Sequence, residues 1–230
     1  MLADRAVCAG PDWLSEQPEL IETLRTWIAW APSGRRFRWT EIDDLGRELN
    51  LPVRGKNEGE KDFPDFKAAV RALRVIRALI DDVAAVVLIR DMDDQEDRER
   101  GLRQARDRHE QQGGSFRVVL GVANPKRECW VLAGFDPFNE QERRLLEEER
   151  SYLGFGPVER SEQLTAKHHE DKRSAKRVLE KLTQGNWQRE KQCWTVTQLD
   201  TMRSRGQKNG LASYLKEVED RLVPLVLSTK

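Results

Sequence analysis

The feature that most constrains the fold of this chain is an apolar run that ends abruptly in acids. Residues 83–89 carry no charged side chain, and Asp91, Asp93 and Asp94 follow Arg90. A continuous run of this length, rich in valine and isoleucine, is typical of a strand that is covered on both faces of a parallel sheet. The sequence therefore predicts a central strand here.

Asp91 and Asp93 lie at the carboxyl end of that strand, where parallel sheets bind their ligands. In an extended chain residues two apart project to the same side, so both carboxylates are predicted to converge on one point. Such oxygens suit Mg²⁺, which keeps several waters and can hold a phosphate beside the protein. Helix capping or solvated loop acids are the competing explanation, because Asp and Glu supply 40 of the 230 residues.

The segments around this run follow the order of a parallel sheet. Apolar residues recur at helical spacing over 66–81, a strongly charged helical pattern covers 95–112, and 116–122 is a second apolar strand. Strand, helix and strand in this order predict a βαβ unit.

The N-terminal part of the chain is predicted to add further strands. Residues 5–10 are predicted to form a short first strand, and Gly10-Pro11-Asp12 to open a helix over 13–28. Residues 36–42 alternate polar and apolar side chains, which predicts a half-buried strand. Glycine, proline and charged residues over 51–65 predict an exposed loop.

A second candidate site follows strand 116–122. Glu128 lies beside Lys126 and Arg127, where it is predicted to act as a further metal ligand or a general base. The competing interpretation is a salt-bridged helix start with Trp130 and Leu132 buried.

Basic residues gather between 167 and 177, before and within a predicted helix. This cluster suits phosphate binding, or stabilisation of charge on a phosphate under attack, and comprises Lys167, Lys172, Arg173, Lys176 and Arg177. A solvated helix face is the alternative. The adjacent His168 and His169 do not predict zinc, because no cysteine or further histidine lies near them in the sequence.

Composition limits the function classes. Lys plus Arg and Asp plus Glu both total 40, so no overall field draws the chain to nucleic acid or membranes. Cys8, Cys129 and Cys193 form no C-x-x-C motif and are predicted to be reduced and mostly buried. Neither a signal peptide nor an apolar run long enough for a membrane span is seen, which predicts a cytoplasmic protein.

Taken together, these residues resemble the Toprim domain of primases, topoisomerases and overcoming-lysogenization-defect nucleases, over about residues 5–180. The resemblance rests on the predicted strand that ends at Ala9, on the D-x-D of Asp91 and Asp93, and on the later Glu128 and Lys172. It departs from the family at Ala9, where the family has a glutamate that serves as general acid or base, or as metal ligand.

The resemblance implies an α/β fold with a mostly parallel central sheet flanked by helices. A metal-binding core over residues 1–135 would carry a mainly helical C-terminal extension over 136–230. The implied activity is that of an endonuclease dependent on Mg²⁺ or Mn²⁺, which cleaves DNA or RNA in antiviral defence beside an ATPase partner. Asp91 and Asp93 would hold the metal, Glu128 would be an auxiliary acid, and Lys172 would stabilise phosphate charge. The residues expected to contact nucleic acid are Lys126, Arg127, Lys172, Arg173 and Lys176.

Because Ala9 replaces the glutamate that the resemblance implies, the chain is predicted to be inactive. Either the alanine is an engineered substitution, or the domain is naturally degenerate and binds without cutting. Two further functions stay open at this point. One is a catalytically silent interaction module whose tryptophans and apolar tail dock a partner protein. The other is a different D-x-D enzyme, such as a metal-dependent phosphatase or a sugar transferase. Homo-oligomer formation also stays open.

Overall fold

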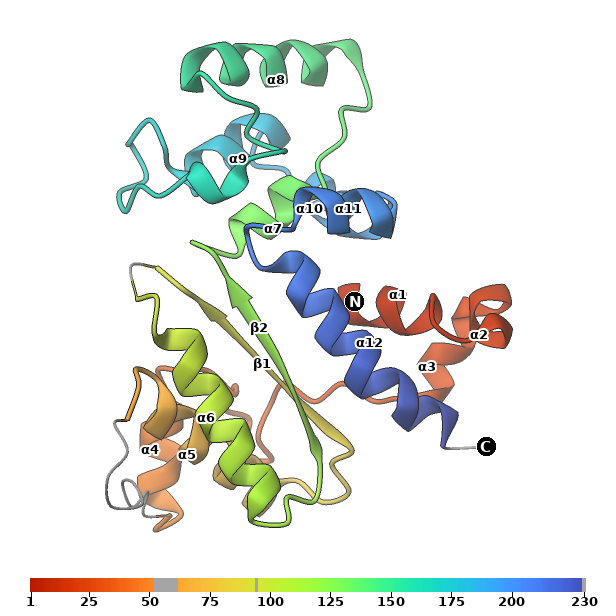
Figure 1. Cartoon of the computed structure of the whole chain (residues 1–230), viewed down its shortest axis with the longest axis vertical. Coiled ribbons are helices and arrows are strands. Elements are labelled where there is room, and N and C mark those ends of the chain that lie inside the picture. Colours follow the sequence, from red (N-terminus) through yellow and green to blue (C-terminus); the bar gives the residue numbers. More distant parts are fainter. Residues whose placement is uncertain (52–61, 94, 229–230) are drawn as a thin grey trace.

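The fold of the computed structural model is built on a small parallel sheet (Figure 1). β1 (Ala85–Asp91) pairs with β2 (Arg117–Ala123), with Ala85 beside Arg117 and Asp91 beside Ala123, and α6 (Arg98–Gln111) connects the two strands. The predicted βαβ unit is therefore confirmed. The structure describes residues 1–51, 62–93 and 95–228, and within them the sheet has these two strands, fewer than the sequence predicted.

Helices cover both faces of the sheet, as the apolar run predicted. Even-numbered apolar residues of both strands face α5 (Phe66–Leu79) and α6, and α4 (Ile42–Glu48) packs on the same cluster. Odd-numbered apolar residues face α1 (Leu2–Cys8) and α12 (Leu211–Leu227). Because strand side chains alternate between faces, a strand buried on both sides must be apolar throughout. The α/β class is confirmed.

A helical part follows β2 and lies beyond the carboxyl ends of the strands (Figure 1). Its residues share a third apolar cluster that includes Phe135, Leu164 and Leu182. Asn139, Ser174 and Asn186 begin three of its helices, each accepting a backbone N–H with its side chain. Its elements are α7 (Glu128–Ala133), α8 (Glu140–Leu153), the 3₁₀ turn η2 (Ser161–Gln163), α9 (Ala175–Thr183), α10 (Trp187–Thr195) and α11 (Leu199–Arg205).

The last helix, α12, returns to the sheet and packs on β2 and α1. One apolar cluster thus combines residues from the start, the middle and the end of the chain. The proposed domain boundary at residue 135 stays a prediction. In the part of the chain that the structure describes, no helix is both long and apolar enough to cross a membrane.

The N-terminal part differs most from the sequence prediction. Residues 5–10 are not a strand, because α1 covers Leu2–Cys8 and buries Ala3, Ala6 and Val7 at helical spacing. Periodicity cannot separate helix from strand in so short an apolar segment. The predicted strand over 36–42 was also wrong: it contributes one isolated bridge, Trp30 to Arg36, and α4 begins at its end.

The predicted helix over 13–28 is divided into three short pieces. These are α2 (Asp12–Glu16), the 3₁₀ turn η1 (Pro18–Leu20) and α3 (Ile21–Leu24). The division falls at Pro18, which lacks the N–H that a continuous helix needs. Of the loop predicted over 51–65, residues 52–61 lie outside the described residues.

Candidate functional site at the strand ends

The carboxyl end of β1 meets the start of α7. Asp91 is the last residue of β1, and its Oδ1 accepts hydrogen bonds from the backbone N–H of Arg127 at 3.0 Å and from Arg127 Nε at 3.3 Å. Glu128, the next residue, begins α7. The parallel pairing of β1 and β2 thus brings Asp91 into contact with Arg127, which lies 36 positions later in the sequence.

Asp93 belongs to a different set of contacts from Asp91. Its backbone has a φ of +49°, so the chain leaves the extended conformation on which the predicted convergence of the two acids rested. The Asp93 carboxylate accepts a hydrogen bond from Arg98 Nη1 at 3.0 Å. Each acid of the D-x-D therefore binds its own arginine.

Arg98 organises the acidic end of β1, and the sequence analysis did not single it out. It is buried at the start of α6, and its Nε lies 2.7 Å from Asp65 Oδ2. Its Nη1 also donates to the carbonyl oxygen of Asp91. Arg90 adds a second ion pair to Asp65, at 3.0 Å. In the sequence nothing separates Arg98 from the other arginines of its helix. Its burial sets it apart, and burial is seen only in the structure.

The two acids at the end of β1 are each held through one carboxylate oxygen. Among the described residues, neither Asp91 Oδ2 nor Asp93 Oδ1 accepts a hydrogen bond. Mg²⁺ is commonly held by one or two carboxylates, with water and substrate phosphate as its other ligands. Within residues 1–51, 62–93 and 95–228, no group of three His, Cys, Asp or Glu side chains is placed to hold a metal ion. Asp94 lies outside these ranges.

Around Glu128 the structure confirms the helix start with Trp130 and Leu132 buried. Lys126 donates from Nζ to the carbonyl oxygen of Ala166 at 3.2 Å, so this ammonium is already held by the helical part. Arg127 is the more accessible cation, with 67% of its side chain exposed.

Two of the basic residues predicted to bind phosphate, Lys172 and Arg177, contact α8. Lys172 Nζ lies 4.9 Å from the centre of the Tyr152 ring, and Arg173 lies over Phe155. Arg177 pairs with Glu149 at 2.7 Å. Lys176 is exposed on α9. Lys172, Arg173 and Arg177 therefore have packing partners in the helical part, and phosphate binding by the cluster stays a prediction.

Ala9 does not lie at a strand end. It follows α1, and a Cβ added to the neighbouring Gly10 would lie 3.0 Å from Val223 Cγ2, near the C-terminal end of α12. The carboxyl end of β2 instead contacts Gly210, which precedes α12. From Gly210 to Val223 the helix rises about 20 Å. Position 9 therefore does not end a strand, as predicted from the sequence, and it lies near the opposite end of α12 from the carboxyl end of β2.

All three cysteines are free and buried, as predicted. Burial raises the pKa of the Cys129 thiol to about 12, and the negative charges of Glu128 and Asp91 contribute to that rise. Burial also raises the pKa of Cys193, to about 11. Neither thiol is a nucleophile at neutral pH, since the thiolate is the reactive form.

Comparisons with protein-family models, with curated proteins and with solved structures find no match for this chain. The class of the protein therefore rests on its fold and site. It is an α/β protein with a two-stranded parallel sheet in its described part, and acids and arginines meet at the carboxyl ends of the strands.

Proposed function

We propose that this chain is a metal-dependent nuclease whose active site lies at the carboxyl ends of β1 and β2. The observation that carries the proposal is the contact of Asp91 with Arg127, at 3.0 Å from the backbone N–H, beside Glu128. This contact places the Asp91 carboxylate, which keeps one free oxygen, against the exposed guanidinium of Arg127, and the acid Glu128 is the next residue. All three are at the carboxyl end of the strands, where parallel sheets bind ligands.

Each residue has a distinct role in this proposal. Asp91 and Asp93 would hold Mg²⁺ or Mn²⁺ through their free carboxylate oxygens, and the bound ion would polarise the phosphate and acidify a water. Arg127 would bind a phosphate oxygen of the nucleic acid, because a guanidinium donates several hydrogen bonds to such oxygens. Glu128 would accept a proton as general base. A role for Lys172 stays a prediction.

Cleavage assays test the proposal. The chain should cut plasmid DNA or RNA when Mg²⁺ or Mn²⁺ is present, and Asp91→Asn or Asp93→Asn should slow cleavage more than about 10-fold. Asparagine keeps the shape and one acceptor oxygen, so both variants should fold. Asp200→Asn is the matched control, because that side chain is 92% exposed on α11. Cleavage that persists unchanged in both site variants would exclude these acids as metal ligands.

The new position of Ala9 changes the expected activity of the chain. A glutamate at position 9 would lie near the far end of α12, about 20 Å along that helix from the strand ends. The chain is therefore proposed to be active with Ala9, and Ala9→Glu should leave the cleavage rate unchanged. The choice between DNA and RNA, the ATPase partner and the antiviral setting stay predictions.

A second candidate function, a partner-docking module without catalysis, is favoured by exposed aromatic residues. Trp30 and Trp187 expose more than half of their surface, and Ile28 does so beside Trp30. The apolar tail supports this candidate less, since Leu222 is buried and Val223 contacts Gly10. The cleavage assay separates the two candidates: silence of the wild-type chain on DNA and on RNA with either metal favours docking.

A further inference from the structure

The segment between Glu22 and Glu41 differs in composition from the rest of the chain. Residues 23–40 hold four arginines and three of the seven tryptophans, and no aspartate or glutamate. In the whole chain these two acids supply 40 of the 230 residues. The segment is therefore a local basic stretch in a chain without net charge.

A short hairpin organises this segment. Trp30 and Arg36 lie opposite each other in an isolated antiparallel bridge, and the N–H of Ala31 donates to Arg35 O at 2.7 Å inside the turn. Opposite side chains of an antiparallel pair project to the same face. The Arg36 guanidinium accordingly lies over the Trp30 ring, 4.6 Å from its centre. The arginine holds one side of the ring, and the ring stays on the surface.

The two faces of the hairpin differ in burial. Phe37 and Trp39 pack on the apolar cluster that α4 and α5 share. On the other face Trp30 exposes 51% of its surface, and both Arg36 and Arg38 are exposed. Residues two apart in an extended chain project to the same side, so Arg38 follows Arg36 on this face. The surface formed by Trp30, Arg36 and Arg38 is named the Trp30 face.

The arginines of the Trp30 face are not neutralised by neighbouring acids. Arg35 pairs with Glu48 at 2.6 Å and with Glu41 at 3.8 Å, so these two acids are already held. In the part of the chain that the structure describes, neither Arg36 nor Arg38 has an ion-pair partner. Both guanidinium groups are therefore available to an anion from outside.

The hairpin leads directly to the carboxyl end of β1. Trp39 Nε1 donates to Ile89 O at 2.8 Å, and the Trp39 ring lies 5.3 Å from the Arg90 guanidinium. Arg38 immediately precedes Trp39, and Asp91 follows Ile89 by two residues. The basic surface is thus attached to the strand end where the proposed active site lies.

We propose that the Trp30 face binds single-stranded nucleic acid, with a base stacked on Trp30 and phosphates held by Arg36 and Arg38. Stacking on a side chain needs an unpaired base, because the bases of a duplex already stack on one another. Guanidinium groups bind phosphate oxygens through charge-assisted hydrogen bonds. Two unpaired arginines beside the ring favour this ligand over the apolar surface of a protein. The inference rests on the proposed nuclease function and names a single strand as its substrate class.

Fluorescence anisotropy with the full chain tests the proposal, in EDTA so that no metal-dependent cleavage occurs. The probes are labelled oligothymidylate and oligouridylate of about 12 nucleotides, and a labelled DNA duplex of the same length is the control. At least one single strand should bind about 10-fold more tightly than the duplex, and the tighter of the two identifies the strand as DNA or RNA. Equal or tighter binding of the duplex would overturn the proposal. Absence of single-strand binding would overturn it too, and would leave Trp30 to the docking of a partner protein.

Variants locate the binding surface. Trp30→Ala should weaken single-strand binding about 5-fold or more, whereas Trp30→Phe keeps an aromatic ring and should retain most of it. The control is Trp187→Ala, which removes a tryptophan that is 61% exposed on α10. Arg38→Gln should weaken binding and lower the slope of its salt dependence by about 0.7, and Arg143→Gln, exposed on α8, should change neither. Unchanged binding by Trp30→Ala and Arg38→Gln would overturn the proposal.

Binding in EDTA and cleavage with metal are separate readouts. A chain that binds the single strand but cuts no nucleic acid with Mg²⁺ or Mn²⁺ would overturn the proposed nuclease function and support the Trp30 face as a binding site. A chain that cuts nucleic acid but does not prefer the single strand would overturn only the inference about the Trp30 face.

Discussion

Arg98 is the residue on which the acidic end of β1 depends. Its guanidinium is buried and contacts the carboxylates of Asp65 and Asp93 as well as the carbonyl oxygen of Asp91. The charge at this site is therefore balanced by the protein itself before any cation binds. Asp65, which is mostly buried, receives a second ion pair from Arg90.

Replacement of Arg98 by methionine should strongly destabilise the fold. The variant leaves Asp65 with one arginine fewer in a poorly solvated place, and breaking such a pair costs about 3–5 kcal/mol of the free energy of unfolding. Chemical denaturation measures the loss. Arg100→Met on the same helix is the control, because that side chain is exposed and should change stability by less than about 0.5 kcal/mol. Equal effects of the two substitutions would show that Arg98 has no special structural role.

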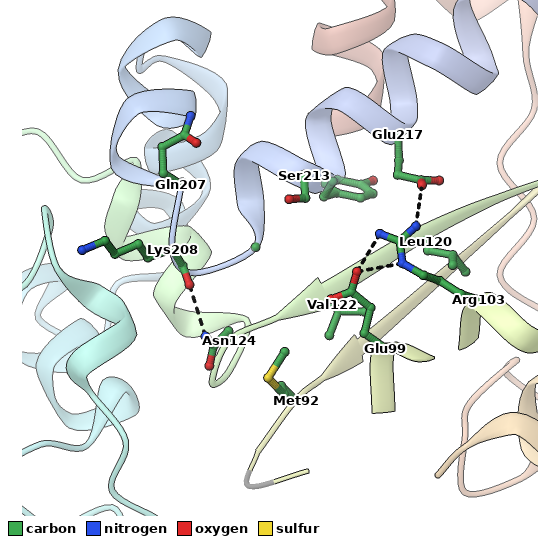
Figure 2. A pocket seen from close by; sticks show the side chains of 12 residues that line it. Met92, Glu99, Arg103, Leu120, Val122, Asn124, Gln207, Lys208, Ser213 and Glu217 are labelled. Carbon is green, nitrogen blue, oxygen red and sulfur yellow. Dashed lines mark hydrogen bonds and ion pairs between the residues drawn. The ribbon is translucent and has the colours of Figure 1, made fainter. Parts of the chain in front are cut away.

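At the level of elements, the two strands have outer edges of different kinds. On β1 side chains satisfy outward carbonyls: Trp39 Nε1 donates to Ile89 O at 2.8 Å, and Arg98 donates to Asp91 O. On β2, Leu120 and Val122 line a pocket of about 200 Å³ between α6 and α12 (Figure 2), and the carbonyl oxygen of Val122 lies against Gly210. Side-chain donors thus satisfy the outer edge of β1, whereas the outer edge of β2 is buried between α6 and α12.

Amide hydrogen exchange should reveal this difference along β2. The N–H groups of Val119 and Gly121 donate to β1, whereas those of Leu120 and Val122 point to the opposite edge, beside the pocket between α6 and α12, so protection should alternate with a period of two. Native-state exchange followed by NMR measures it, and the odd-numbered amides are the internal control. Uniform protection along the strand would mean that burial alone protects the amides of the outer edge.

The elements that could be predicted from the sequence are those with a strong local pattern. β1, β2, α5 and α6 follow from apolar runs or helical spacing in their own residues. α1 could not be predicted, because its short apolar segment fits either conformation until α12 packs on it. The pairing of Arg98 with Asp65 could not be predicted from the sequence either, since it depends on contacts between α6 and the start of α5.

At the scale of the whole molecule, buried carboxylates hold the helical part together. Arg189 pairs with Glu142 at 2.8 Å, and Glu149 receives Arg177 at 2.7 Å and Lys181 at 3.1 Å. Burial alone would raise the pKa of Glu142 and of Glu149. The hydrogen bonds from these cations outweigh it, so that both pKa values lie below their ordinary value of 4.5.

These lowered pKa values predict that acid destabilises the protein through its helical part. A carboxyl group whose pKa is lower in the folded than in the unfolded state stabilises the fold above the unfolded value of about 4.5, and this contribution is lost as pH falls through the folded value. Glu149→Gln should therefore be less stable at pH 7 and lose less stability between pH 7 and pH 3, as measured by urea unfolding. Glu147→Gln, on the same helix but 65% exposed, should keep the wild-type pH dependence. If Glu149→Gln lost as much stability between pH 7 and pH 3 as the wild-type chain does, the acid-sensitive groups would lie elsewhere.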